Sequence, residues 1–233
     1  MRAREAGSAL RSEVTIPVQG DQTSGTISVP RHARGVVLFA HGSGSSRHSP
    51  RNRMIADALE VLGLATLLVD LLTPDEARED EQTGALRFDT GLLTARVLDG
   101  IAWLEREARN LPIGLFGAST GAAAALAAAA DRPDSVRAVV SRGGRPDLAG
   151  AALGDVQAPT LLIVGGADPE VLTLNRQAFE ALRCEKRLSV VPGATHLFEE
   201  PGALEEVARL AGTWLLRYVP TDGRDAVNGA RAR

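Results

Sequence analysis

The sequence predicts a single α/β domain built on a doubly wound, mostly parallel β-sheet, and three observations carry this prediction. The chain of 233 residues is long enough for one sizeable domain. Short apolar runs alternate with segments of helical periodicity, as in right-handed βαβ units. Most of these runs lack strict alternation with polar residues, which is typical of parallel strands covered on both faces.

The elements are expected in the following order. Two β-rich runs, residues 13–18 and 25–30, flank the segment QGDQTS and predict an N-terminal antiparallel hairpin. The parallel strands are expected at residues 35–40, 64–70, 112–117, 136–141, 159–166 and 188–193. The helices are expected at residues 51–62, 89–108, 120–131, 170–182 and 203–217. The stretch 141–159 leaves room for a short helix but for no large lid domain.

The composition limits the classes of function. The net charge of −3 argues against a nucleic-acid binder. The histidines are scattered, the single Cys184 has no partner, and the glycine-rich segments lack the phosphate-binding motifs. We therefore expect no metal and no cofactor. The acidic run 73–80 is interpreted as a solvated loop, with a place beside the site as the alternative.

The chain ends predict a domain over residues 12–218, between a flexible segment at 1–11 and a disordered tail at 219–233. The first residues lack the apolar core of a secretory signal, and no segment reaches the ~20 apolar residues that cross a membrane. We therefore expect a cytoplasmic protein without membrane contacts. The oligomeric state stays open between monomer and dimer.

Ser119 is the candidate nucleophile. It lies in Gly-Ala-Ser-Thr-Gly, residues 117–121, between a predicted strand and an alanine-rich helix. The pattern G-x-S-x-G in this context is the nucleophile elbow, a strained turn that exposes the serine hydroxyl at a helix N-terminus. A small-residue turn is the alternative, and the pattern occurs by chance roughly 0.1 times in such a chain.

A serine hydroxyl needs a base, and His196 is the candidate. In folds that carry this elbow, the order along the chain is serine, acid, histidine. Of the four histidines, His32, His41 and His48 precede Ser119 and only His196 follows it. His196 also lies in the loop after the last predicted strand, where ligands of such sheets bind. His41 is interpreted as bracing its loop.

Asp168 is the candidate acid, since it follows a predicted strand and two glycines between Ser119 and His196. Its carboxylate would fix the tautomer of His196 and stabilise the imidazolium. Asp131 and Asp134 end a predicted helix, and Asp147 is explained as a helix N-cap. The alternative for Asp168 is that it caps the helix expected at 170.

The oxyanion hole is expected in two loops. His-Gly-Ser-Gly, residues 41–44, follows an early strand, where the fold places one donor. The residue after the nucleophile supplies the other. The predicted donors are the backbone N–H groups of Ser43 and Thr120.

These motifs resemble an α/β-hydrolase of the dienelactone hydrolase-related group. The likeness rests on HGSGSSRHSPRN, GASTGAAAAL, SRGGRPDLAG, LLIVGGADPEVL and VVPGATHLFEEPGALEEVA, and covers roughly residues 12–217. Similar small hydrolases occur alone or fused to phosphoribosyltransferases. The resemblance implies the α/β-hydrolase fold and Ser119, Asp168 and His196 as a triad. It departs from dienelactone hydrolases proper, whose nucleophile is cysteine, so the lactone substrate is not carried over.

Four basic residues are candidates for substrate binding: Arg142, Arg145, Arg47 and His48. Arg142 and Arg145 follow a predicted strand, and the other two lie near the oxyanion loop, with Arg51 close by. Because the arginine fork suits carboxylate or phosphate, a small anionic substrate is one interpretation. The alternative is that these arginines hold loops through Asp70, Asp147 or backbone carbonyls.

The sequence thus predicts a serine esterase or thioesterase that acts on a small soluble ester through an acyl-enzyme intermediate. Two alternatives remain at this point. The same residues permit acyl transfer to an alcohol or amine, and the scaffold also permits a non-catalytic protein that binds a small molecule.

Overall fold

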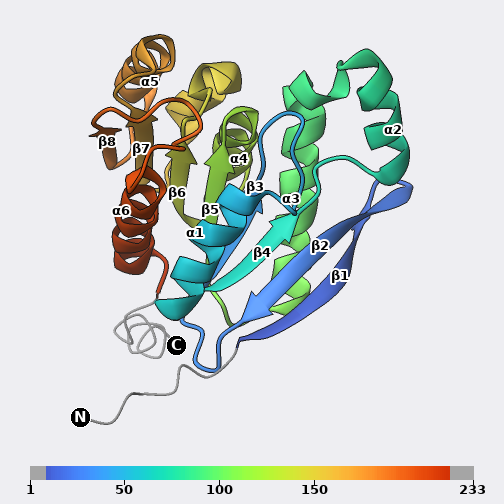
Figure 1. Ribbon diagram of the computed structural model, residues 1–233. Helices are drawn as coiled ribbons and strands as arrows, with labels where there is room; N and C mark the ends of the chain where they lie inside the picture. The colour runs from blue at the N-terminus through green and yellow to red at the C-terminus, as the bar shows by residue number, and fades with distance from the viewer. Residues whose placement is uncertain (1–8, 221–233) are drawn as a thin grey trace, which may run out of the picture.

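The computed structural model describes residues 9–220, so the predictions for residues 1–8 and 221–233 lie outside the described part. Within it, the chain forms an eight-stranded sheet in the order β1-β2-β4-β3-β5-β6-β7-β8 (Figure 1). The strands are β1 (Leu10–Val18), β2 (Asp21–Val29), β3 (Val36–Ala40), β4 (Ala65–Val69), β5 (Ile113–Ala118), β6 (Val136–Arg142), β7 (Thr160–Gly165) and β8 (Lys186–Val191). All pairs among β3 to β8 are parallel, as expected, and the N-terminal hairpin joins them through an antiparallel pair between β2 and β4.

Helices cover both faces of this sheet. Their bounds are α1 (Pro50–Val61), α2 (Pro74–Thr83), α3 (Thr90–Glu107), α4 (Thr120–Asp131), α5 (Pro169–Ala181) and α6 (Ala203–Tyr218), with 3₁₀ helices η1 (Leu86–Phe88) and η2 (Pro146–Asp155). Figure 1 shows α1 and α6 together on the viewer's side of the sheet. No helix in residues 9–220 is long and apolar enough to cross a membrane.

The two faces carry separate cores because side chains alternate along each strand. On β3, Leu38 packs with α3 and α4, whereas Phe39 packs with α1 and α6. Every residue of β3, β4, β5 and β7 is buried. This explains why their sequences lack alternation, and it confirms the doubly wound sheet without a large lid domain.

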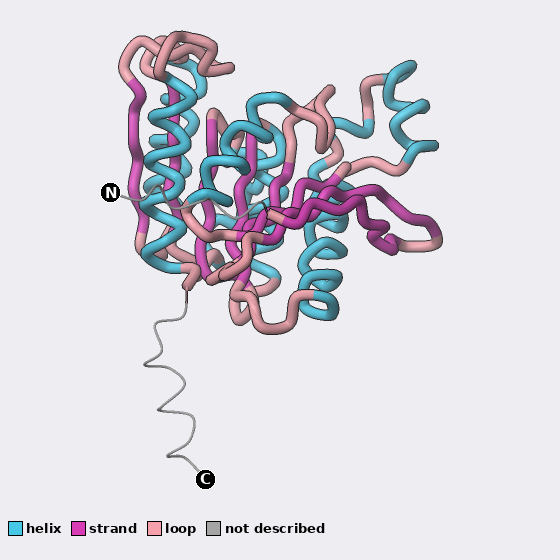
Figure 2. The backbone as a smooth tube through the Cα atoms, turned by 60° about the horizontal axis from the view of Figure 1, so that its bottom comes forward, coloured by secondary structure: helices cyan, strands magenta, loops and turns pink. Residues whose placement is uncertain are grey.

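The N-terminal hairpin is longer and tighter than expected. β1 pairs with β2 from Leu10 to Val29 around a two-residue turn at Gln19 and Gly20. Gly20 has a φ of 75°, which suits glycine in such a turn. Most of QGDQTS, expected to be a connection, therefore belongs to β2. Figure 2 shows the hairpin projecting beyond the rest of the sheet.

The acidic run 73–80 also differs from expectation, because it is a helix rather than a loop. Thr73 is the N-cap of α2: its hydroxyl accepts from the Glu76 N–H at 3.3 Å, and Glu76 accepts from the Thr73 N–H at 2.8 Å. This capping box, with Pro74 at the first helical position, is a start signal visible in the sequence.

Candidate active site

Ser119 lies between β5 and α4 in a strained backbone conformation. Its φ is 51° and its ψ is −122°, and Phe198 is the other non-glycine residue with positive φ among the described residues. Such a conformation costs on the order of 1–3 kcal/mol and persists only where the surroundings fix it. The side chain is partly exposed at the carboxyl end of a central strand.

The two glycines of the motif are required by close contacts. A Cβ atom at Gly117 would lie 2.4 Å from the Ala122 Cα, and one at Gly121 would lie 2.3 Å from the His41 carbonyl oxygen. Neither distance is compatible with a side chain. The glycines thus allow α4 to start directly against β5 and the loop after β3.

Hydrogen bonds from the turn after β6 hold the Ser119 backbone. The Ser119 N–H donates to the Arg142 carbonyl at 3.3 Å, and the Arg145 N–H donates to the Ser119 carbonyl at 3.0 Å. The Ser119 carbonyl also accepts from the Ala122 N–H at 3.1 Å. The strained residue is therefore tied to both the neighbouring strand and its own helix.

His196 and Asp168 are in direct contact. Nδ1 of His196 donates to Oδ2 of Asp168 at 2.8 Å, which leaves Nε2 free to accept a proton. The other oxygen of Asp168, Oδ1, accepts from the Val171 N–H at 3.3 Å as the N-cap of α5. One oxygen of Asp168 thus caps the helix, which was the alternative interpretation, and the other makes the contact with His196 that a catalytic acid would need.

Gly143 links the serine side of the site to the histidine side. It follows Arg142, and a Cβ atom on it would lie 3.7 Å from Nδ1 of His196 and 3.2 Å from the Phe198 ring. Ser119, Asp168 and His196 thus all lie at the same edge of the sheet, after the carboxyl ends of β5, β7 and β8. Within residues 9–220 the structure joins His196 to Asp168 by a hydrogen bond but records none between His196 and Ser119.

The loop after β3 lies against Ser119. A Cβ atom at Gly42 would lie 3.0 Å from the Ser119 Cβ, and Ser43 is the next residue. Thr120 is the first residue of α4, where a helix leaves its N–H without an internal partner. Neither the Ser43 nor the Thr120 N–H donates to another described residue, so both are available for a ligand oxygen.

His41 braces this loop, as the sequence indicated. Its Nε2 accepts from the Leu71 N–H at 3.1 Å, so the proton is on Nδ1, which donates to the Gly42 carbonyl at 2.9 Å. Burial lowers the pKa of His41 below its usual value. The ring is therefore a neutral structural group rather than a base.

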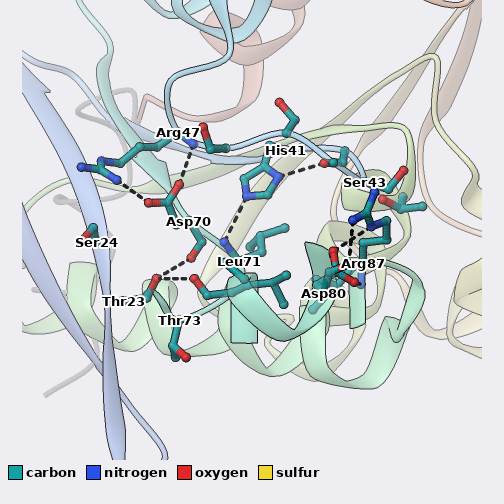
Figure 3. A pocket seen from close by; sticks show the side chains of 18 of the residues that line it. Thr23, Ser24, His41, Ser43, Arg47, Asp70, Leu71, Thr73, Asp80 and Arg87 are labelled. Carbon is teal, nitrogen blue, oxygen red and sulfur yellow. Dashed lines mark hydrogen bonds and ion pairs between the residues drawn. The ribbon is translucent and has the colours of Figure 1, made fainter. Parts of the chain in front are cut away.

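A cavity of about 420 Å³ opens beside the predicted oxyanion hole, over the ends of β3 and β4 (Figure 3). Ser43 and Thr120 both line it. The rest of the lining combines apolar surface, such as that of Leu71, Leu72 and Leu93, with hydroxyl and charged groups from β2, the loop after β3, the end of β4, α2 and η1. The contributions of Thr23 and Arg87 were not expected, because nothing in the sequence places β2 or η1 here.

Asp80 and Arg87 fix the outer wall of this cavity. Asp80 is buried, and its Oδ2 accepts from Nε of Arg87 at 2.7 Å while its Oδ1 accepts from the Arg87 N–H at 2.9 Å. Figure 3 shows this pair next to Ser43. The run 73–80 thus borders the site, which was the alternative interpretation.

Two of the four predicted substrate-binding residues, Arg47 and Arg145, are paired with carboxylates. Arg47 pairs with Asp70 and, at 3.1 Å, with Glu13. Arg145 pairs with Asp147 at 2.8 Å. Asp147 therefore binds a neighbouring side chain instead of serving as the expected N-cap, and the η2 N-cap position is Arg145 itself.

The remaining two basic residues behave differently. His48 is largely exposed, and its Nδ1 is 2.7 Å from Nη2 of Arg53. Arg142 is 7 % exposed and makes no side-chain hydrogen bond or ion pair with the described residues. Only Arg142 of the four is thus buried at the site with its charge unpaired.

Comparison with known proteins identifies the family. Residues 35–161 match the model of the alpha/beta hydrolase fold family. A crystal structure of dienelactone hydrolase from Anabaena variabilis is 53 % identical, with a TM-score of 0.90 over 91 % of this chain and 99 % of that one. Est1E from Butyrivibrio proteoclasticus, 15 % identical with a TM-score of 0.72 over 91 % of this chain and 98 % of its own, shares the fold.

Curated relatives from Mycobacterium tuberculosis, named putative phosphoribosyl transferases, are 56 % identical over 213 residues. These residues are 90 % of this chain but 47 % of the relatives, so the chain spans about half of their length. The expected resemblance is thus confirmed. The chain belongs to the α/β hydrolase family and is similar to its dienelactone hydrolase members, which supports hydrolase activity.

Proposed function

We propose that this protein is a serine hydrolase that cleaves a small ester or thioester. The observation that carries the proposal is the contact between His196 and Asp168 at the same sheet edge as Ser119 in its strained elbow. A serine nucleophile, a histidine with one free ring nitrogen and a carboxylate that contacts the other ring nitrogen are the groups that acyl transfer needs.

The reaction follows from these positions. Nε2 of His196 accepts the proton of the Ser119 hydroxyl while Oγ attacks the acyl carbon. The carbonyl oxygen becomes an oxyanion, which the N–H groups of Ser43 and Thr120 stabilise. The bond to the leaving group then breaks, and His196 gives its proton to the leaving oxygen or sulfur.

Water completes the cycle. His196 accepts a proton from a water molecule that attacks the acyl-Ser119 ester, and the tetrahedral intermediate collapses to a free acid and a restored hydroxyl. Throughout, Asp168 holds the tautomer of His196 and stabilises its charged form.

The cavity bounds the substrate. About 420 Å³ accommodates a small organic group, and the mixture of apolar, hydroxyl and charged groups in the lining favours one with both apolar and polar parts. The relatives' phosphoribosyl transferase name is not carried over, because the matched region is less than half of those proteins.

The test is labelling of the full chain with a fluorophosphonate, together with hydrolysis of p-nitrophenyl esters of increasing acyl length. Ser119→Ala is expected to abolish labelling and to lower turnover by at least about 10³-fold. Ser12→Ala, an exposed serine on β1, is the matched control and should do neither. Labelling or turnover that persists in Ser119→Ala would refute the assignment of the nucleophile.

A chain that neither labels nor hydrolyses any ester would instead favour a binding protein on this scaffold. Acyl transfer is separated by product analysis with added alcohols and amines, because a transferase forms new esters or amides where a hydrolase releases acid.

A further inference from the structure

Arg142 at the end of β6 has a buried positive charge without a counterion. Its side chain is 7 % exposed, and its Nε and Nη1 are fully enclosed with no acceptor among the described residues. The Phe198 ring lies on one side, with its centroid 5.9 Å from the guanidinium carbon. The other buried arginine of residues 9–220, Arg96, has a carboxylate partner in Glu76 at 2.6 Å.

This charge is costly to bury and is nevertheless retained. Burial, and next the charge of Arg51, lower the pKa of Arg142 to about 10, so the group still carries its proton at neutral pH. An unpaired buried ion costs several kcal/mol unless a partner compensates it. The unpaired guanidinium of Arg142 therefore does not stabilise the fold, and its retention indicates a negatively charged partner that binds to it.

Arg51 adds a second cation from the first turn of α1. Its Nε is enclosed without a partner, and its Nη1 donates to Glu199 at 3.0 Å, whose side chain is 65 % exposed. The first turn of α1 contains no acidic residue, so the helix dipole adds to the positive potential. Of these two guanidinium groups, Arg51 thus has one exposed carboxylate partner, and Arg142 has none among the described residues.

The position of Arg142 relates it to the nucleophile. Its carbonyl accepts from the Ser119 N–H at 3.3 Å, and β6 is the neighbour of β5 on the side away from β3 and β4. The 420 Å³ cavity lies over β3 and β4. Arg142 thus lies on the side of Ser119 opposite to the cavity, and we place one part of a bound ester in the cavity and the other on the side of β6.

We propose that Arg142, together with Arg51, binds a carboxylate or phosphate group carried by the substrate. This inference rests on the proposed function and names its substrate class: an ester with an anionic group on the part that lies outside the cavity. The planar fork of arginine suits such oxyanions, because two N–H groups can bind two oxygens.

The first experiment compares matched esters. Mono-p-nitrophenyl adipate carries a carboxylate at the end of its acyl chain, and p-nitrophenyl hexanoate has the same length without it. The wild-type chain is expected to prefer the adipate in kcat/KM, and Arg142→Met to reduce that preference at least about tenfold. Arg137→Met, an exposed arginine on the same strand, should leave it unchanged. If the wild type shows no preference for the adipate, or Arg142→Met keeps it, the inference is overturned. Hydrolysis of either ester would still support the proposed function.

The second experiment does not depend on turnover. Free glutarate or phosphate is expected to raise the Tm of the wild type and of Arg137→Met, but not of Arg142→Met, and the two anions distinguish a carboxylate from a phosphate site. Without anion, Arg142→Met should be at least as stable as the wild type. Equal Tm shifts in all three proteins, or none, would refute the anion site even for a chain without esterase activity. If Arg142→Met does not fold, Arg51→Gln takes its place in both experiments with the same expected direction.

Discussion

Asp168→Asn separates the two roles of the Asp168 carboxylate. Oδ1 caps α5 through the Val171 N–H, whereas Oδ2 accepts from Nδ1 of His196. Asparagine is as good an N-cap as aspartate, but its loss of charge weakens the interaction with the helix dipole by about 0.3–1 kcal/mol. We therefore expect the free energy of unfolding to fall by at most about 1 kcal/mol.

The effect on catalysis should be far larger. An amide at Oδ2 no longer holds His196 in the tautomer with a free Nε2, and it no longer stabilises the imidazolium. The expected loss in kcat is about 10³- to 10⁴-fold, which corresponds to about 4–5.5 kcal/mol of transition-state stabilisation. Urea unfolding measures the first effect, and p-nitrophenyl ester turnover measures the second.

Asp89→Asn is the matched control. Asp89 caps α3 through the Leu92 N–H at 2.9 Å and has no contact with His196, so this variant should lose similar stability and keep its turnover. The reasoning fails if Asp168→Asn retains more than about a tenth of the wild-type kcat at normal stability, because Asp168 would then be a helix cap alone.

Three further predictions concern the surroundings of the site. Gly121→Ala would gain about 1 kcal/mol from helix propensity, but its Cβ would lie 2.3 Å from the His41 carbonyl oxygen. We therefore expect the free energy of unfolding, measured with urea, to fall by at least about 2 kcal/mol. A stabilised variant would contradict this. His41 has a lowered pKa, so the unfolded chain binds more protons below the usual value of 6.5, and wild-type stability should fall toward pH 5 by at most about 1.4 kcal/mol per unit. In His41→Gln this part of the pH dependence should vanish, and a parallel pH curve would show that His41 is charged in the fold. Thr73→Ala removes one half of the capping box of α2 and should lower the free energy of unfolding by about 1 kcal/mol, whereas an unchanged urea midpoint would mean that α2 does not depend on its cap.

The order of strands and helices was predictable from the sequence because it depends on local patterns. Fully apolar runs marked the parallel strands, and the position of Asp168 and His196 after two of them predicted that the side chains would meet, which they do at 2.8 Å. The tight turn of the N-terminal hairpin was missed because Thr23 and Ser24 have the composition of a loop. Pairing with Thr15 and Ile16 of β1 places them in a strand instead.

The partners of the arginines could not be predicted from the sequence. Arg47 lies in the loop after β3 and Arg142 is the last residue of β6. The two side chains have the same chemistry, yet Arg47 meets Asp70 and Arg142 meets no carboxylate within the described residues. The difference depends on the register of β3 against β4, which places Asp70 beside the loop that contains Arg47. Ion pairs between positions far apart in the sequence form only when the sheet has assembled. Helix caps such as Asp89 and Thr73, in contrast, contact residues close by in the sequence and can be predicted from it.

The strand order gives the groups of the site unequal protection against local opening. Ser119 follows β5, which is paired with β3 and β6, whereas His196 follows β8, an edge strand paired only with β7. Edge elements exchange their amide protons through partial openings that leave the central strands intact. Mild denaturant should therefore release the histidine loop before the core unfolds, so ester turnover would decline at concentrations where the helical circular dichroism signal is still native.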